Sequence, residues 1–446
     1  MKNILLLCTV LIITFSANAT PPFSNAIEKI VTDAREGDGK AQLDLALLYY
    51  DGENLPQDYK KAKAWFEKAS KQNIMLAQYL LGEMYYYGQG VEQDFQMAKK
   101  FIEKAAHQGM PHAQYFLADM YSREVLGFRD YAIALRWYEK AAIQGHVIAQ
   151  FDLGSMYYLG IGVRQDSIMA KKWLKQSAEQ GNEKAQLYLG MLYYGEAREQ
   201  LDYLKAKEWL EKSAAQKNPL AELSLGRMYL LGEGVNQDYM KAKLLFEKAA
   251  AQENADAQYH LGKMYINGHG VLKNYSKAKE WFERGVIQGD QQSQVALGQI
   301  YYLGLGTSPN FFEAKKWFDK AADQDNAEAK FLLGTLYHDG NGVRQDLIKA
   351  KEYFQASALQ GDASAQSALG RMYFFGEGGS KDYAKAKGWL EKAAKQGDAK
   401  AFMILGGLHL QENGSSKGRS KAKELFGSAC DNGLQEGCEA YKLLNK

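Results

Sequence analysis

The sequence repeats with a fixed period, and this period constrains the fold more than any other feature. A Leu-Gly or Leu-Ala pair recurs every 36 residues from Leu45 to Leu405. An alanine recurs in the same register at eleven consecutive places: Ala62, Ala98, Ala134, Ala170, Ala206, Ala242, Ala278, Ala314, Ala350, Ala386 and Ala422. Such a period indicates an array of one supersecondary unit, whose members bury their apolar faces only by stacking on their neighbours. We therefore expect eleven structural repeats, not three ordinary domains.

One repeat, residues 77–112, predicts a pair of antiparallel helices. Residues 77–87 place apolar side chains at helical spacing, and Gly88-Gln89-Gly90 ends this first helix because glycine adopts the left-handed conformation freely. Asp94 can cap a second helix. That helix carries an apolar stripe from Ala98 to Ala105 and ends at Gly109. Small residues such as Gly82 and Ala98 let the two helices approach closely.

Large rings on the second helix fill space toward the neighbouring repeat. They are Trp65, Phe101, Trp137, Trp173, Trp209, Trp281, Trp317 and Trp389. The predicted fold is all-α: a right-handed α-solenoid of eleven 36-residue helix-turn-helix repeats over residues 41–436. Residues 20–40 should hold an N-terminal capping helix, because Ile27, Ile30, Val31 and Ala34 share one helical face. Residues 437–446 should form a C-terminal capping helix.

The repeat resembles the Sel1-like repeat family, which is related to tetratricopeptide repeats. The resemblance lies in a Leu-Gly-x-x-Tyr helix, a Gly-x-Gly-Val turn, an Asp cap and a Lys-Ala-x-x-Trp-x-x-Lys-Ala-Ala helix, and it covers residues 41–436. The segments 124–128, 195–200 and 414–419 depart from the pattern. They predict atypical loops within the same fold.

Two cysteines stand near the C-terminus. Cys430 lies at the end of a second helix, and Cys438 lies at the start of the next helix across a tight turn. In an oxidising compartment this arrangement predicts a disulfide. The spacing is similar to that of the Helicobacter cysteine-rich branch of the family. Two thiols without a nearby histidine make the alternative, a zinc site, the weaker interpretation.

Residues 1–19 are typical of a signal peptide. Lys2 precedes an apolar stretch over residues 4–15, and Ala17-Asn18-Ala19 provides the small residues for cleavage after Ala19. A membrane anchor is the alternative, but the stretch is too short to span a bilayer comfortably. We therefore expect an exported protein, periplasmic or secreted, without a transmembrane segment. A eukaryotic endoplasmic-reticulum location stays open, because Asn274 and Asn413 lie in glycosylation motifs.

No pattern in the sequence predicts catalytic chemistry. The seven histidines show no metal-binding spacing, and the glycine turns lack the Gly-Lys-Ser/Thr ending of a phosphate loop. The formal net charge of +2 gives no reason to expect nucleic acid. We expect no cofactor, no metal, no enzymatic activity and a monomer. Described members of the cysteine-rich branch imply one alternative, a β-lactam- or peptidoglycan-associated activity.

Variable positions on the first helices are the candidate binding residues. By analogy with tetratricopeptide arrays, these helices line a concave face. Ring-bearing candidates are Tyr86, Tyr158, Tyr194 and Tyr302, and charged candidates are Arg227, Lys263 and Arg371. The rings suit peptide contacts. The bases could bind an acidic segment of an extended partner, because acids occur early and bases late along the same column. The alternative is that the rings pack within the repeats and the charges are solvated. The sequence thus predicts an exported scaffold for a protein or peptide partner, and the resemblance to the family implies a virulence or envelope factor as one version of it.

Overall fold

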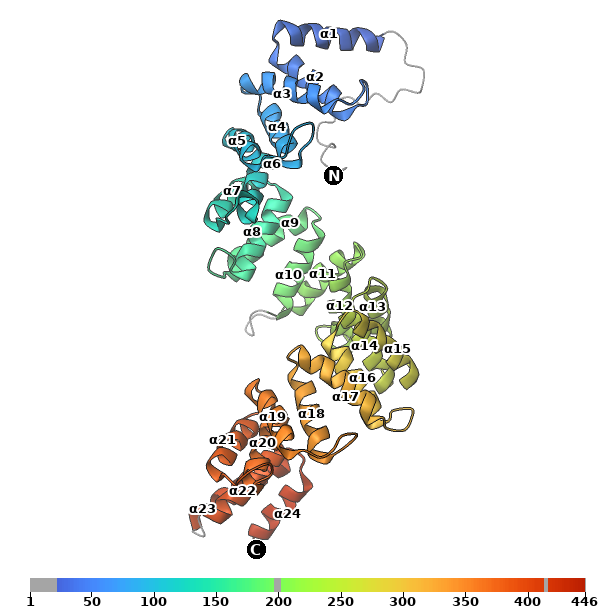
Figure 1. Cartoon of the computed structure of the whole chain (residues 1–446), viewed down its shortest axis with the longest axis vertical. Coiled ribbons are helices and arrows are strands. Elements are labelled where there is room, and N and C mark those ends of the chain that lie inside the picture. Colours follow the sequence, from blue (N-terminus) through green and yellow to red (C-terminus); the bar gives the residue numbers. More distant parts are fainter. Residues whose placement is uncertain (1–21, 196–201, 413–415, 446) are drawn as a thin grey trace. The chain divides into compact units, whose positions relative to one another are not determined.

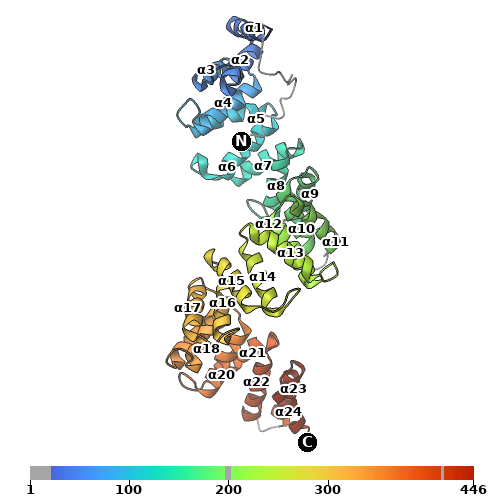
Figure 2. The same cartoon turned by 90° about the vertical axis from the view of Figure 1, so that its right-hand side faces the viewer.

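The computed structural model describes residues 22–195, 202–412 and 416–445, and every regular element in these ranges is helical. The predicted leader over residues 1–19 and its cleavage site lie outside them. The described chain divides into an N-terminal block ending at Gln216 and a C-terminal block beginning at Lys217. In each block, antiparallel helix pairs follow one another along the chain (Figures 1 and 2). The predicted all-α solenoid fold is confirmed.

Each repeat contributes a first and a second helix. The first helices are α2 (Gly39–Asp51), α4 (Met75–Tyr87), α6 (Pro111–Ser122), α8 (Val147–Leu159), α10 (Glu183–Gly195), α12 (Pro219–Leu231), α14 (Ala255–Asn267), α16 (Gln291–Leu303), α18 (Ala327–Asp339), α20 (Ala363–Phe375) and α22 (Ala399–Glu412). The second helices are α3 (Tyr59–Lys71), α5 (Phe95–His107), α7 (Tyr131–Ile143), α9 (Ser167–Glu179), α11 (Tyr203–Ala215), α13 (Tyr239–Ala251), α15 (Tyr275–Ile287), α17 (Phe311–Asp323), α19 (Leu347–Leu359), α21 (Tyr383–Lys395) and α23 (Ser416–Asp431). At the ends, α1 (Pro22–Glu36) packs on α2, and α24 (Gln435–Leu444) packs on α23.

Side-chain caps begin the second helices, as the sequence predicts. In ten repeats an Asp or Asn accepts a hydrogen bond from a backbone N–H of the first turn: Asp58, Asp94, Asp130, Asp166, Asp202, Asp238, Asn274, Asn310, Asp346 and Asp382. Glycines in the left-handed conformation end most first helices, as at Gly88 (φ 70°). Where the sequence departs from the glycine turn, η2 (Glu124–Leu126) replaces it and buries Leu126.

The core lies between the two helices of a repeat. A Cβ on Gly82 would come within 2.5 Å of Ile102 Cγ1 and 3.2 Å of the Ala98 carbonyl oxygen, so the helices touch where the sequence places glycine. The residue at the Ile102 position is the deepest part of the core, and in other repeats it is the fully buried Phe66, Phe246, Phe282 or Phe318. The large rings that the sequence predicts between repeats stand one residue before the Ile102 position. Trp137, Trp173 and Trp209 are buried, and the other rings of this set are half-buried.

Glutamine pairs join successive repeats along the array. Nε2 of Gln108, at the end of α5, donates to Oε1 of Gln78 on α4, and Gln78 in turn donates to the Ser70 carbonyl at the end of α3. We call this arrangement a Gln–Gln rung. Equivalent rungs join Gln72–Gln42, Gln144–Gln114, Gln180–Gln150, Gln216–Gln186, Gln288–Gln258, Gln324–Gln294 and Gln396–Gln366. Each rung satisfies an amide that stacking would otherwise bury without a partner.

Candidate partner-binding site

The first helices form one face of each block. First helices of adjacent repeats contact each other, as α8 does α10, α14 does α16 and α20 does α22. Residues equivalent to Leu76, Leu80, Glu83 and Tyr87 of α4 lie three or four residues apart and so form one stripe along each first helix. We call the surface made by these stripes the first-helix face.

The four predicted tyrosines pack against neighbouring rings. Tyr86 lies edge-on to Phe95 (5.3 Å between ring centroids) and to Phe116 (4.8 Å). The other three make edge-on contacts of the same kind: Tyr158 with Tyr188, Tyr194 with Tyr203, and Tyr302 with Phe311. Such pairs stabilise the structure beyond the area they bury. The contacts give these half-buried rings a structural role, which the sequence left open.

Arg227 and Lys263 both lie close enough to the half-buried His260 for their charges to act on it. Burial first, and the charges of Arg227 and Lys263 second, lower the pKa of His260 to about 4. His260 and Lys263 line a small hollow of about 240 Å³ with Tyr239 and His269. Arg227 is exposed. The structure therefore brings two of the three predicted bases together.

The third base, Arg371, has acidic and imidazole partners within the chain. One of its terminal nitrogens lies 2.8 Å from Nε2 of His338 and 3.6 Å from a carboxylate oxygen of Glu377. Nδ1 of His338 lies 2.6 Å from Asp339. Arg371 donates to Nε2 when His338 is neutral, with Nδ1–H donating to Asp339. The charge of Arg371 is thus balanced locally by Glu377.

The N-terminal block carries buried carboxylates on its first-helix face. The Tyr79 hydroxyl donates to Glu83 (2.7 Å), and burial raises the pKa of Glu83. Asp152 on α8 is half-buried. Burial, and next the charge of Asp119, raise its pKa to about 7. The sequence shows these acids but not their burial.

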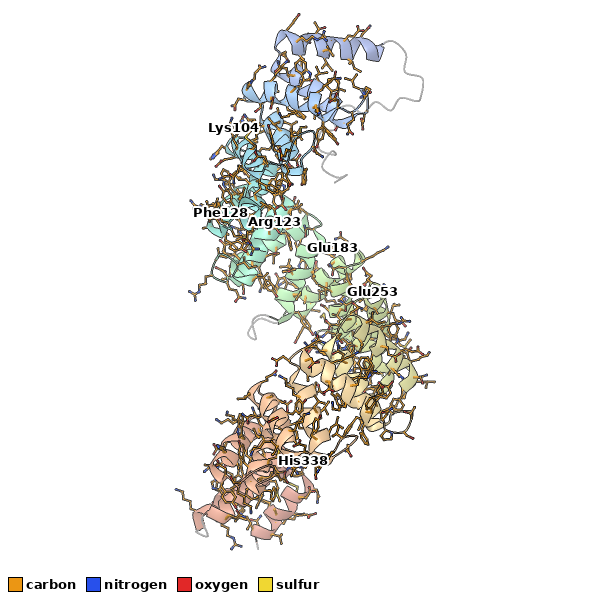
Figure 3. The ribbon with its side chains drawn as sticks, in the orientation of Figure 1. Lys104, Arg123, Phe128, Glu183, Glu253 and His338 are labelled. Atoms are coloured by element: carbon orange, nitrogen blue, oxygen red, sulfur yellow. A yellow bond between two sulfur atoms is a disulfide. The ribbon has the colours of Figure 1, made fainter. Side chains whose placement is uncertain are left out.

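A hollow of about 660 Å³ surrounds Asp152. It is lined by α6, α7, α8 and the start of α10, and its residues include Tyr115, Asp119, Arg123, Tyr138, Phe151, Ser155, Glu183 and Lys184. Figure 3 labels Arg123 and Glu183, two of these residues. Nε of Arg123 donates to Asp119 (2.7 Å), whereas the Tyr115 hydroxyl is the hydrogen-bond partner of Asp152. We call this hollow the α8 hollow.

A second hollow, of about 830 Å³, is built from equivalent positions six repeats later, in the C-terminal block. We call it the α20 hollow. Its lining includes Phe331, Thr335, His338, Phe354, Ala368, Arg371, Asp398 and Lys400. Phe331 and Phe354 stand where Tyr115 and Tyr138 stand in the α8 hollow. Ala368 takes the position of Asp152, and Arg371 takes the position of Ser155. Figure 3 labels His338 at this second hollow.

At one edge of the first-helix face, exposed apolar residues occur in every second repeat. At the last position of the stripe stand Tyr87, Leu159, Leu231, Leu303 and Phe375, all 53–59% exposed. The intervening repeats have Asp51, Arg123, Gly195, Asn267, Asp339 and Gln411 there. Neighbouring repeats therefore present alternately apolar and polar or small residues at this edge.

The two C-terminal cysteines form a disulfide, with Cα atoms 4.6 Å apart. Cys430 stands at the Ser70 position and Cys438 at the Gln78 position of the repeat. The covalent bond therefore replaces the hydrogen bond that Gln78 makes to the Ser70 carbonyl. In the described ranges there is no group of three or more His, Cys, Asp or Glu side chains placed to hold a metal ion. No helix in those ranges is long and apolar enough to cross a membrane.

Comparisons with known proteins agree with this architecture. The Sel1 repeat model matches eleven segments between residues 39 and 434. A crystal structure of a protective antigen present in uropathogenic Escherichia coli strains, with an SLR fold, is 34% identical; the match covers 94% of this chain and 90% of that one, with a TM-score of 0.73. A Sel1 repeat protein from Oxalobacter formigenes is also 34% identical, over 69% of this chain and 90% of that one, with a TM-score of 0.56. No curated protein matches the chain. The repeat match and these two relatives establish that the chain belongs to the Sel1 repeat family.

Proposed function

We propose that the chain is an exported scaffold that binds a protein or peptide partner on its first-helix face. The observation that carries this proposal is the pair of equivalent hollows six repeats apart, which place aromatic rings at the same two positions and each contain charged groups. Concave sites that combine apolar walls with a few convergent polar groups are the usual places for ligands. Arrays of this kind use extended surfaces for recognition.

The predicted leader and the disulfide support export, because disulfides persist in oxidising compartments. A role as a virulence or envelope factor has support from the relative described as a protective antigen of uropathogenic strains. The β-lactam alternative lacks comparable support. Ser155 donates to the Phe151 carbonyl, Ser122 donates to the Asp119 carbonyl and Ser367 donates to Asp398, so none of these three serines donates to a lysine or histidine.

Site-specific photo-crosslinking in the native host tests the proposal. A crosslinking residue at Leu159 or Leu303 lies on the first-helix face, whereas one at Ile143 or Leu359 lies exposed at the end of a second helix. We expect a discrete adduct with one partner from the first pair and none from the matched second pair. Equal adducts from all four positions, or none from any, would contradict the proposal.

A further inference from the structure

The α8 hollow and the α20 hollow share a framework but carry their arginine at different positions. In the α20 hollow, α20 itself supplies Arg371, whose guanidinium reaches His338 and Glu377. In the α8 hollow the equivalent residue is Ser155, whose hydroxyl bonds back to its own helix. The α8 hollow thus has no basic side chain at this position, and its own arginine, Arg123, stands where the α20 hollow has Asp339.

The α8 hollow contains carboxylates that could pair with a basic side chain from outside the chain. Asp152 takes the place of Ala368, and Asp119 takes the place of Thr335, so two acids replace two uncharged residues. Among its lining residues, Asp119, Asp152 and Glu183 outnumber Arg123 and Lys184. Arg123 is held by Asp119, and its side chain is 65% exposed at the rim. The half-buried carboxyl of Asp152 has the Tyr115 hydroxyl as a hydrogen-bond partner.

The walls also suit a cation. Tyr115, Tyr138 and Phe151 line the hollow around Asp152. Aromatic faces attract ammonium and guanidinium groups, more strongly when water is excluded. A volume of about 660 Å³ exceeds what one long side chain needs and leaves room for the backbone that carries it.

We propose that the α8 hollow receives a lysine or arginine side chain from an extended segment of the partner protein, in the place that Arg371 fills within the α20 hollow. This inference rests on the proposed function and names the chemistry of the partner. The cation would lie against Asp152, beside the contacting rings of Tyr115 and Tyr138. The rest of the segment would run along the first-helix face.

Binding should depend on pH because Asp152 must ionise to pair with the cation. Its pKa of about 7 reflects burial first, then Asp119, opposed by Arg123 and Lys184 and by the Tyr115 hydrogen bond. Glu183 on α10 and Tyr138 on α7 are the other titratable groups that line the hollow. A bound cation favours the ionised form. Affinity should therefore rise as the pH increases through about 7.

The experiment is a selection of short random peptides on the purified full chain, followed by affinity measurements from pH 6 to pH 8. We expect enriched peptides to share one lysine or arginine, and replacing it by alanine should weaken binding roughly tenfold or more. Asp152→Asn should weaken binding similarly and remove its pH dependence. Ser155→Arg should also weaken it, because the chain then carries its own cation, as in the α20 hollow. Glu92→Gln, an exposed carboxylate on a connecting loop, is the matched control and should bind like the parent chain.

The outcomes separate this inference from the proposed function. Selected peptides that lack a common basic residue, or that bind Asp152→Asn and Ser155→Arg as tightly as the parent, overturn the inference but leave the scaffold function standing. If Asp152→Asn does not fold, Ser155→Arg decides alone. A selection that enriches no peptide, together with crosslinking that finds no partner, counts against both.

Discussion

Nε2 of Gln108 donates to Oε1 of Gln78 at 2.6 Å, although thirty residues separate them. Gln78 is 2% exposed and also donates to the end of the preceding repeat. The amide therefore ties three helices, α3, α4 and α5, through one side chain. Because a repeat contacts only its neighbours, such bonds contribute directly to the coupling between repeats.

Gln108→Ala should destabilise this junction by about 1–2 kcal/mol, because it leaves the buried Oε1 of Gln78 without its donor. Urea unfolding followed by circular dichroism measures the loss, and hydrogen exchange should place it in α4 and α5. Gln93→Ala is the control. Gln93 is exposed and donates only to the Tyr86 carbonyl, so its loss should cost at most about 0.5 kcal/mol. Equal losses in both variants would refute a special role for the rung.

Removing the disulfide should loosen the C-terminal end. Replacing both Cys430 and Cys438 by alanine should cost about 2–3 kcal/mol and speed hydrogen exchange in α24 while leaving α4 unchanged. The matched variant, Cys430→Ala with Cys438→Gln, introduces the residues of the ordinary repeat. It should recover part of the protection, because the glutamine can donate to the carbonyl of residue 430. Loss of structure in distant repeats in either variant would contradict this local role.

His146 should make the chain sensitive to acid. It caps α8 through Nδ1, and burial first, then His112, lowers its pKa to about 4. Since the unfolded chain takes up a proton near pH 6.5 and the folded chain does not, stability is lost as the pH falls from about 6.5 to about 4. At pH 5 the loss is on the order of 2 kcal/mol.

His146→Asn tests this, because Asn182 and Asn218 cap the next two first helices in the same position. The variant should match the parent at pH 7.5 and exceed it at pH 5 in thermal unfolding. His107→Asn, at an exposed site on α5, is the control and should change the difference between the two pH values little. A variant whose melting temperature falls with acid as steeply as that of the parent would show that another group is responsible.

Trp173 should contribute through its volume and not through its indole N–H. The side chain is 4% exposed in the core of the N-terminal block, and its Nε1 has no hydrogen-bond partner. Trp173→Ala should cost about 3–5 kcal/mol because it leaves a cavity. Trp173→Phe should cost about 1 kcal/mol or less, because it removes an unsatisfied donor and matches Phe101, the residue at this position two repeats earlier. Similar losses in the two variants, measured by urea unfolding, would contradict this explanation.

The sequence predicted the fold closely because one pattern is repeated eleven times. Asp94 as a cap, Gly88 as a helix end and Gly82 as a contact each lie where their local chemistry indicates. The glutamines at positions 78 and 108 were equally regular in the sequence. Their role was missed because a polar residue in a helix is usually solvated, and only the stacking of three helices shows that Gln78 is buried.

The site was less predictable because it depends on differences between repeats. Tyr86 and its equivalents were predicted as possible contacts, but their partners lie thirty residues away or in the next helix. Arg371 resembles Arg227 in the sequence, and only the structure shows that Glu377 and His338 engage it. The hollow around Asp152 needed the sizes of side chains on three successive first helices. No local pattern encodes such a volume.

The exposed apolar residues from Tyr87 to Phe375 divide the repeats into two alternating kinds, one with an apolar edge residue and one with a polar or small one. A partner that contacts the apolar residues at this edge must match steps of two repeats, because single steps bring it against Arg123 or Asp339. Gain or loss of one repeat would leave every helix pair intact. It would nevertheless place two repeats of the same kind next to each other and shift the apolar edge residues of all later repeats by one repeat. Gain or loss of two repeats would keep the apolar and polar edge residues alternating as before. Length changes in this chain are therefore not equivalent, and even and odd changes should differ in what the surface can recognise.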